Sequence, residues 1–328
     1  MTDVPSTSDH SPQPHEARKP RTWRRAVVRG AVVYVAVPYL AIAALIAVFQ
    51  RSLIYQPTRA AVISAEAGRT PSDSIHNIAV RTHDGLELNG WHCLAAGCTA
   101  KDAAECDREL RGDRLLVLYF PGNGGNRSHR SADCRDFSQL GANVFLVDYR
   151  GYGDNAGSPS EDNFVADARS IWKYATERGV DPDRIVLFGE SLGGGVATRL
   201  AAELCESGTP PAGLILSSTF SSLVDTAGWH YPYLPVRLLL RDQYPSVQRA
   251  PSITCPVLQI HGGRDTIVPI EFGRRLSQAL PQTSANGVQK RFVELPNAGH
   301  NDIPSADFAA AVSDFFESIR AAQGSAKR

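Results

Sequence analysis

The sequence lacks any surplus of charge, because Lys+Arg and Asp+Glu both total 34 in 328 residues. Such a balance gives no electrostatic basis for binding nucleic acid or another polyanion. It also lacks a metal-ligand pattern, since none of its six cysteines forms a C-x-x-C pair and no Cys/His cluster has zinc-like spacing. We therefore expect no nucleic-acid partner, no metal and no cofactor.

The cysteines allow two interpretations. Their even number suits an oxidising compartment, where Cys98 and Cys106 could close a short loop as a disulfide. Alternatively, most of them are small buried apolar residues.

Charge is absent from residues 31–49. At a rise of ~1.5 Å per residue, such a helix spans roughly 29 Å, about the thickness of a bilayer's hydrocarbon core. Pro38 would kink this helix without excluding a span. A buried core helix rarely runs this long without a polar face. A cleavable signal peptide is the stronger alternative, but the run exceeds a usual h-region and no small-x-small site ends it.

We therefore expect a transmembrane anchor over residues 23–52, with its span at about 31–49, after a disordered tail over residues 1–22. Basic residues gather before the span, at Arg18, Lys19, Arg21, Arg24, Arg25 and Arg29, whereas Arg51 and Arg59 follow it. The more basic side stays cytoplasmic, which predicts a cytoplasmic N-terminus and an extracytoplasmic remainder, periplasmic in a Gram-negative bacterium.

Beyond the anchor, short apolar runs alternate with helix-like segments. The runs are residues 78–82, 86–94, 114–120, 143–149, 184–189, 212–218, 256–262 and 291–296. The helix candidates lie near residues 126–140, 161–178, 192–206, 267–280 and 305–321. Continuous apolar runs are typical of strands covered by helices on both faces. This predicts one α/β domain over residues 53–328, with a mostly parallel eight-stranded sheet flanked by helices. Residues 220–250 interrupt the alternation and are a candidate short lid.

The strongest chemical motif is Gly189-Glu190-Ser191-Leu192-Gly193, which follows one apolar run and precedes a helix-like segment. A serine on such a strand-to-helix turn is held in a strained conformation with its hydroxyl exposed. Glycines two residues away on either side are needed because a Cβ there would clash with the neighbouring strand and helix. The context, more than the motif alone, predicts that Ser191 is a nucleophile.

A serine nucleophile needs a base, and the base needs an orienting carboxylate. Asp265 and His300 follow the last two predicted strands, in the chain order Ser, Asp, His that this architecture uses. Carboxyl ends of strands are where open α/β sheets place their active sites. Asp225 and Asp302 are rival acids, and Asp265 could instead only form a turn.

The oxyanion of a tetrahedral intermediate needs backbone donors. One is expected to be the N–H of Leu192, directly after the nucleophile. The other is expected to be the N–H of Asn123, in the glycine-rich loop that follows the third predicted strand. Gly122, Tyr152 and Trp229 are candidate substrate-binding residues, although the segment 148–153 also suits a structural turn.

From residue 50 to about 320 the chain resembles the Bem46/ABHD13-type branch of the α/β-hydrolase superfamily. The resemblance lies in QRSLIY (50–55), GNGGN (122–126), DYRGYG (148–153), FGESLGGG (188–195), CPVLQIHGGRD (255–265) and GHND (299–302). It implies the α/β-hydrolase fold with a short lid and a membrane tether, and an esterase, thioesterase or lipid-acyl hydrolase. The chain departs from relatives where Pro121 replaces a histidine, and in a polar insert near residues 95–112 that we expect on the surface.

Together these features predict a serine hydrolase that cleaves carboxyl-ester or thioester bonds through an acyl-enzyme intermediate. The substrate is expected to be a small-molecule or lipid acyl compound, because tethering raises encounters with lipids. A serine peptidase of the same fold and a non-catalytic membrane-bound interaction protein are the alternatives. The sequence gives no indication of the oligomeric state.

Overall fold

The computed structural model describes residues 21–68 and 74–326, and it divides into two compact units that meet between Val48 and Phe49. The prediction of disorder falls mainly on residues 1–20, outside this range. Arg21 and Thr22, which were assigned to the tail, instead begin helix α1.

The N-terminal helix consists of α1 (Arg21–Ala31), the π-helical turn η1 (Val32–Ala36) and α2 (Val37–Ile54). The turn ends two residues before Pro38, and the N–H of Val37 donates to the carbonyl of Val32, five residues earlier. Proline disrupts the regular ladder, and a π turn is one way in which a helix absorbs that disruption. From Thr22 to Ile54 the helix is long and apolar enough to cross a membrane.

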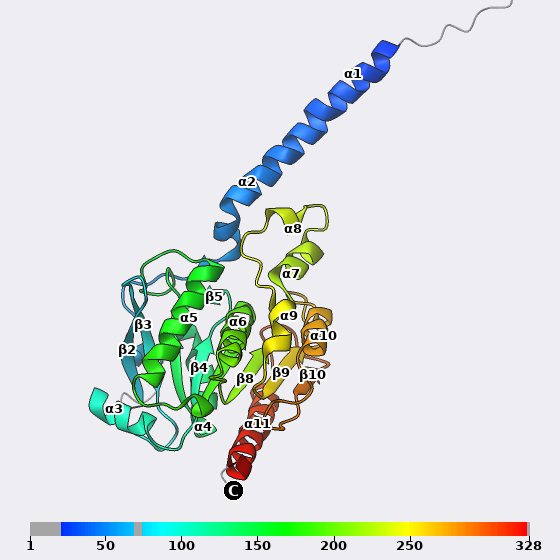
Figure 1. Cartoon of the computed structure of the whole chain (residues 1–328). Coiled ribbons are helices and arrows are strands. Elements are labelled where there is room, and N and C mark those ends of the chain that lie inside the picture. The colour runs from blue at the N-terminus through cyan, green and yellow to red at the C-terminus, as the bar shows by residue number, and fades with distance from the viewer. Residues whose placement is uncertain (1–20, 69–73, 327–328) are drawn as a thin grey trace, which may run out of the picture. The chain divides into compact units, whose positions relative to one another are not determined.

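The second unit is built on an eight-stranded sheet in the order β10-β9-β8-β7-β4-β6-β3-β2 (Figure 1). The strands are β2 (Ile75–Arg81), β3 (Glu87–Cys93), β4 (Leu116–Phe120), β6 (Asn143–Val147), β7 (Ile185–Glu190), β8 (Gly213–Ser217), β9 (Val257–Gly262) and β10 (Arg291–Leu295). The six strands from β10 to β6 are parallel, whereas β3 is antiparallel to both β6 and β2. Each predicted apolar run corresponds to one of these strands.

The helices of this unit are α3 (Ala103–Leu110), α4 (Ser131–Gln139), α5 (Glu161–Thr176), α6 (Leu192–Glu206), α7 (Leu223–His230), α8 (Val236–Leu239), α9 (Ser246–Arg249), α10 (Ile270–Ala279) and α11 (Ser305–Ala326). Short helical turns are η2 (Ala65–Gly68), η3 (Arg127–Arg130), η4 (Pro182–Arg184) and η5 (Ala250–Ser252). Strands β1 (Gln56–Pro57) and β5 (Gly124–Gly125) form a separate two-stranded sheet.

Helices cover both faces of the sheet, as the continuous apolar runs predict. Along β4, Leu116 and Leu118 join the core cluster that contains residues of α5, α6 and α10. Val117, between them, joins the opposite cluster, which contains residues of α4 and α11. Side chains of successive strand residues point to opposite faces, so a strand covered on both sides needs apolar residues throughout.

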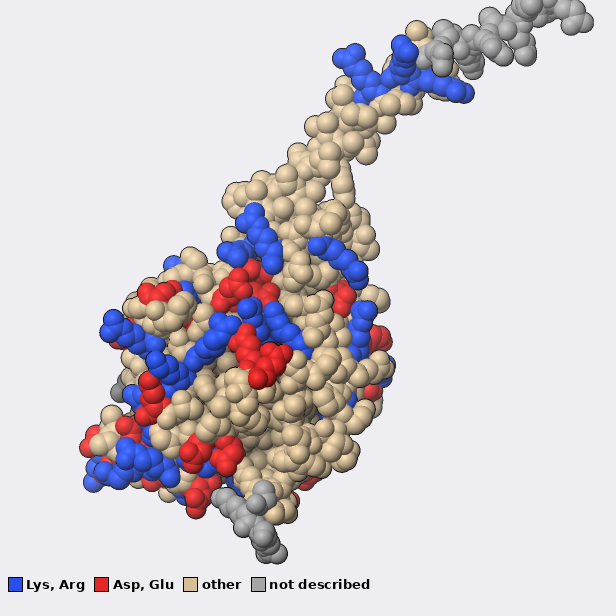
Figure 2. Space-filling view, viewed as in Figure 1, with Lys and Arg blue, Asp and Glu red and all other residues tan. Residues whose placement is uncertain are grey.

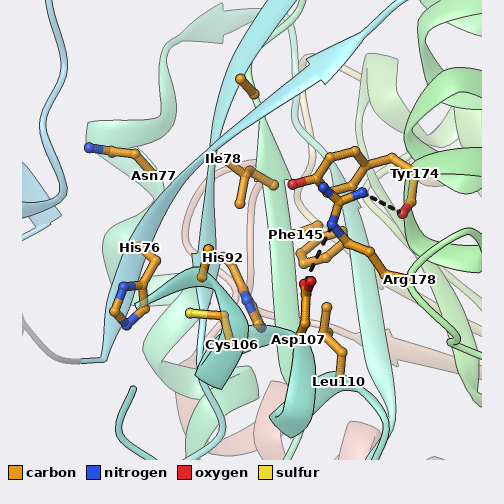
Figure 3. A pocket seen from close by; sticks show the side chains of 12 residues that line it. His76, Asn77, Ile78, His92, Cys106, Asp107, Leu110, Phe145, Tyr174 and Arg178 are labelled. Carbon is orange, nitrogen blue, oxygen red and sulfur yellow. Dashed lines mark hydrogen bonds and ion pairs between the residues drawn. The ribbon is translucent and has the colours of Figure 1, made fainter. Parts of the chain in front are cut away.

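The expected surface insert is only partly polar. It contains α3, whose first turn is capped by the Asp102 side chain accepting from the N–H of Glu105. Cys98 and Cys106 are buried in a small apolar cluster with Leu94, Ala95 and Ala100, and both are free thiols. They thus match the second interpretation of the cysteines. Beside α3, a cavity of about 230 Å³ is lined by residues of β2, β3, β6 and α5 (Figure 3).

The segment expected to be a lid has two parts. Most of its exposed side chains lie between residues 229 and 241, on α7, on α8 and in the turn that joins them, whereas Tyr244 and Ala250 are fully buried in the core cluster that contains α6. The exposed part of the segment therefore ends near residue 241.

Candidate active site

Ser191 lies at the turn between β7 and α6, with a φ of 50°. This left-handed conformation is rare for a residue with a side chain and is the strain expected of a nucleophile turn. A Cβ on Gly189 would lie 2.6 Å from the carbonyl oxygen of Gly193, and one on Gly193 would overlap the carbonyl oxygen of Phe120. Only glycine fits at these two positions.

The structure brings Ser191, His300 and Asp265 together. Ser191 directly follows β7, Asp265 follows β9 and His300 follows β10, so all three lie at carboxyl ends of parallel strands. His300 Nδ1 lies 2.7 Å from Asp265 Oδ2, and His300 Nε2 lies 3.0 Å from Ser191 Oγ. Since a carboxylate only accepts, a neutral imidazole carries its proton on Nδ1 and leaves Nε2 to accept from the serine hydroxyl.

The two rival acids have other partners. Asp225 Oδ2 accepts from Ser221 Oγ at 2.6 Å and lies 3.3 Å from Arg275 Nη1. Asp302 accepts from the backbone N–H of Gly299, within the loop that carries His300. Neither therefore takes the position beside His300 that Asp265 takes.

Asp265 is buried, but its carboxylate is well supplied with donors. Oδ1 accepts the backbone N–H groups of Ile267 at 2.9 Å and of Val268 at 2.7 Å, and His261 Nε2 lies 3.3 Å from Oδ2. Burial alone would raise the pKa of Asp265. The hydrogen bonds from His261, His300 and Val268 outweigh it and hold the pKa below its usual range, so the carboxylate stays ionised.

The glycine-rich loop follows β4, which is the neighbour of β7 in the sheet. Phe120 is paired with Gly189, so the loop starts beside the nucleophile turn. Leu192 is the first residue of α6, and the N–H groups of a first helical turn have no carbonyl partner within the helix. The carbonyl of Asn123 accepts a hydrogen bond from Tyr152 Oη at 2.8 Å, and this bond holds the loop in place.

Glu190 is a residue of this site that sequence reasoning missed. Its Oε2 accepts from Tyr119 Oη at 2.9 Å, from Arg130 Nε at 2.8 Å and, more weakly, from the N–H of Gly122 at 3.4 Å. Burial, followed by the charges of Glu190 and Asp133, raises the pKa of Tyr119, so its hydroxyl remains a donor. Only the place of Glu190 beside the nucleophile could have suggested this role, because Tyr119 and Arg130 are distant in sequence.

The remaining candidates lie at different depths. Tyr152 is buried and bound to Asn123, and Arg150 is buried between the carboxylates of Asp84 and Asp167, as a structural turn requires. Gly122 lies in the loop against Glu190. Trp229 is exposed on α7, with its ring centroid 6.4 Å from that of Phe272.

Comparisons with known proteins agree with this architecture. A family described as serine aminopeptidase, S33, matches residues 113–241. An uncharacterised protein of Mycobacterium tuberculosis is 40% identical over 273 residues, covering 81% of this chain and 89% of its own length. The lysophosphatidylserine lipase ABHD12 of Danio rerio is 34% identical over 243 residues, covering 68% of this chain. The matched part spans 63% of that lipase.

Solved structures share the fold at low sequence identity. An esterase from Pyrococcus furiosus superposes with a TM-score of 0.57 at 19% identity, covering 80% of this chain and 97% of the esterase. Est1E from Butyrivibrio proteoclasticus gives a TM-score of 0.54 at 18% identity, covering 75% of this chain and 99% of Est1E. The expected fold and family are thereby confirmed. With its N-terminal apolar helix and its ABHD-type relatives, the chain is a hydrolase of the α/β-hydrolase superfamily with ABHD-like, membrane-anchored character.

Proposed function

We propose that this hydrolase is a serine esterase that cleaves acyl esters of lipids through an acyl-enzyme intermediate. The observation that carries the proposal is the continuous chain of contacts from Ser191 Oγ through His300 to Asp265, at 3.0 and 2.7 Å. A strained serine, a base within hydrogen-bond reach and an ionised orienting carboxylate together form the arrangement that activates a hydroxyl near neutral pH.

In the first step, Ser191 Oγ attacks the ester carbonyl while His300 Nε2 takes its proton. The new Oγ–C bond pushes the carbonyl electrons onto oxygen, and the N–H groups of Leu192 and Asn123 donate to that oxyanion. The C–O bond to the leaving alcohol then breaks, and His300 returns the proton to the alcohol. Water repeats the cycle with His300 as base, which releases the carboxylic acid and restores Ser191.

Two features support a lipid substrate. The ABHD12 relatives are named lysophosphatidylserine lipases. An apolar helix of membrane-spanning length also precedes the domain, and tethering an enzyme to a bilayer raises its effective concentration toward lipids. A monoacyl lipid presents its carboxyl ester near the bilayer surface, where a tethered enzyme would meet it.

Serine labelling tests the mechanism. A fluorophosphonate probe should label the full-length protein in detergent, with the adduct located on Ser191 by peptide mass spectrometry. Ser191→Ala should not be labelled, and a folded wild-type protein that resists the probe would favour a non-catalytic interaction protein. A series of p-nitrophenyl esters of increasing acyl length then reports the chain-length preference.

A peptidase is the second candidate, because the family that matches residues 113–241 carries an aminopeptidase description. The same triad cleaves amides, so the leaving group decides between the two. Aminoacyl-anilides compared with p-nitrophenyl esters, at equal enzyme concentration, separate them. Faster cleavage of the anilides would contradict the esterase assignment.

A further inference from the structure

Large exposed apolar side chains gather on helices α7 and α8 and on the turn that joins them. Trp229, Tyr231, Tyr233 and Leu238, which we call the lid surface, are 63%, 50%, 68% and 86% exposed. Between α7 and α8, a groove of about 450 Å³ lies beside Leu238 and is lined mostly by apolar residues, together with Asp225 and Arg237. Isolated apolar residues are common on protein surfaces, but several exposed aromatic residues side by side are not. A cluster of this kind on a solvent-exposed surface therefore indicates an interaction site.

The segment that carries the lid surface contains basic but no acidic side chains. From residue 226 to residue 241 the chain contains no acidic residue, and its charged side chains are those of Arg237 and Arg241. The flanking acids Asp225 and Asp242 are largely covered and paired with arginines. Figure 2 shows tan surface over α7 and α8 with basic side chains beside it, whereas groups of red and blue side chains lie elsewhere on this face. An apolar surface with a basic rim suits phospholipid headgroups.

The base of the lid is hydrogen-bonded to the end of α2. Gln50 Nε2 donates to the carbonyl of Leu239 at 3.0 Å, and Gln50 Oε1 accepts the N–H of Arg241 at 2.7 Å. Arg51 donates to both carboxylate oxygens of Asp242, at 2.9 and 3.1 Å, and Tyr55 Oη donates to the same group at 3.0 Å. All these residues belong to the C-terminal unit.

These bonds place residues 239–242 of the lid beside the residues that end the apolar run. Gln50 is the first polar residue after the uncharged run, so a bilayer that holds the anchor ends close to it. Leu239, its partner, is the neighbour of Leu238. Tryptophan and tyrosine are enriched at this boundary because their rings are apolar and their N–H and O–H groups are polar.

We propose that the lid surface lies in the interfacial layer of the membrane and contacts lipid directly. Residues 239–242 bond to Gln50 and Arg51, which directly follow the apolar run, and this is why lipid suits the lid surface better than a separate protein or a second copy of the chain. The catalytic consequence rests on the proposed esterase function. The lid also contacts the loop that carries Asp265. His230 Nε2 lies 2.9 Å from the carbonyl oxygen of Ile267, and the N–H of Ile267 donates to Asp265.

Tryptophan fluorescence tests the contact without any activity. The full-length protein is reconstituted in phosphatidylcholine vesicles whose acyl chains are brominated near the headgroup. Trp23 lies in the anchor helix, so the background carries Trp23→Phe; Trp91 is fully buried and Trp172 is partly buried. We expect quenching of this protein and loss of most of that quenching when Trp229→Phe is added.

Equal quenching with and without Trp229, at equal incorporation, would overturn the proposal. The proposal would also be overturned if Trp229 fluorescence were not quenched by brominated lipid but changed with the protein density in the vesicle, because that result assigns the surface to a second copy. A Trp229 signal that responds only when a soluble protein fraction is added would assign it to a protein partner and would equally overturn it.

Kinetics give a second readout. Leu238→Glu should lower hydrolysis of a monoacyl lipid in vesicles by about tenfold or more, since a carboxylate resists the apolar layer. Hydrolysis of a short water-soluble ester in detergent should stay unchanged. The matched control is Val62→Glu, which alters a residue 78% exposed outside the lid and should affect neither substrate. A wild-type protein without esterase activity would refute the proposed function but leave the fluorescence test valid.

Discussion

The carboxylate of Asp265 receives more donors than a contact with one imidazole requires. Two backbone N–H groups hold Oδ1, while His261 and His300 approach Oδ2. This fixes the orientation of the carboxylate, and the carboxylate in turn fixes the tautomer of His300. His261 itself is held by the carbonyl of Val268 at 2.9 Å, so the acid is supported from its own loop and strand.

Replacing Asp265 by asparagine should lower kcat by roughly 10³–10⁴-fold, because a neutral amide can present its N–H to Nδ1 and place the imidazole proton on Nε2. The KM for a short ester should change much less, since the binding surface is untouched. Steady-state kinetics and the rate of fluorophosphonate labelling measure this. A kcat within tenfold of wild type would remove Asp265 from its proposed role.

The same carboxylate makes a pH-dependent contribution to stability. Because its pKa is lower in the folded protein than the ordinary value of 3.8, Asp265 stabilises the fold fully above that ordinary value. The stabilisation is lost as the pH falls toward the lowered pKa. Urea unfolding of wild type and Asp265→Asn should therefore differ most near pH 7 and progressively less below about pH 4. A difference that grows on acidification would contradict this sign.

Glu190 is expected to act as a positioning residue for the oxyanion loop. Glu190→Gln keeps the shape but loses the charge that binds Arg130, so Gly122 and Asn123 should be less well placed. Oxyanion donors act in the transition state, so kcat should fall by about tenfold with little change in KM. Glu203→Gln, which removes an arginine-paired carboxylate at the end of α6, is the control and should stay near wild type. An equal loss in both variants would reduce Glu190 to a general stability role.

At the level of secondary structure, the sequence predicted all eight strands of the main sheet because each is a short apolar run between turn residues. Burial on both faces removes the polar alternation that a half-exposed strand would show, as Leu116, Val117 and Leu118 illustrate. The nucleophile turn was predictable for a similar reason, since its glycine spacing is dictated by local backbone contacts.

Other features depended on contacts between distant segments. The cluster of Glu190, Tyr119 and Arg130 joins three separate elements, and the spacing of these residues in the sequence does not predict their contact. Tyr244 lies in a segment that looks like part of the lid, yet it is buried against Gly195 of α6. Helix α3 was not predicted because its insert is mostly polar, and only Cys106 and Leu110 of the helix are buried.

The nucleophile turn also gives a sharp test of packing. Gly193→Ala would force a Cβ against the carbonyl groups of Phe120 and Pro121, and both are backbone atoms that cannot move independently. We expect a strong loss of thermal stability or of soluble protein. Gly228→Ala is the matched control, because its Cβ would meet nothing within 4 Å in helix α7. That change should be neutral or stabilising by about 0.5–1 kcal/mol, as measured by thermal unfolding, and a stable Gly193→Ala would contradict the packing account.

On the scale of the whole molecule, the boundary between the two units falls within helix α2. Helix α2 continues to Ile54, inside the C-terminal unit, and its last turns bind the base of the lid. The C-terminal end of α2 and the hydrolase domain therefore lie on the same side of a membrane that the helix spans. The orientation of the helix in the membrane then determines the compartment in which the hydrolase domain meets its substrate.

We propose that this compartment is extracytoplasmic. Arg24, Arg25 and Arg29 precede the apolar run, whereas Arg51 on the far side is already paired with Asp242. The excess of basic charge before the span is expected to keep that end in the cytoplasm. A C-terminal alkaline phosphatase fusion, which matures only outside the cytoplasm, should be active, and a green fluorescent protein fusion at the same site should be dark. Changing Arg24, Arg25 and Arg29 to glutamine should weaken this preference, whereas a bright fluorescent fusion of the unaltered chain with an inactive phosphatase fusion would reverse the assigned topology.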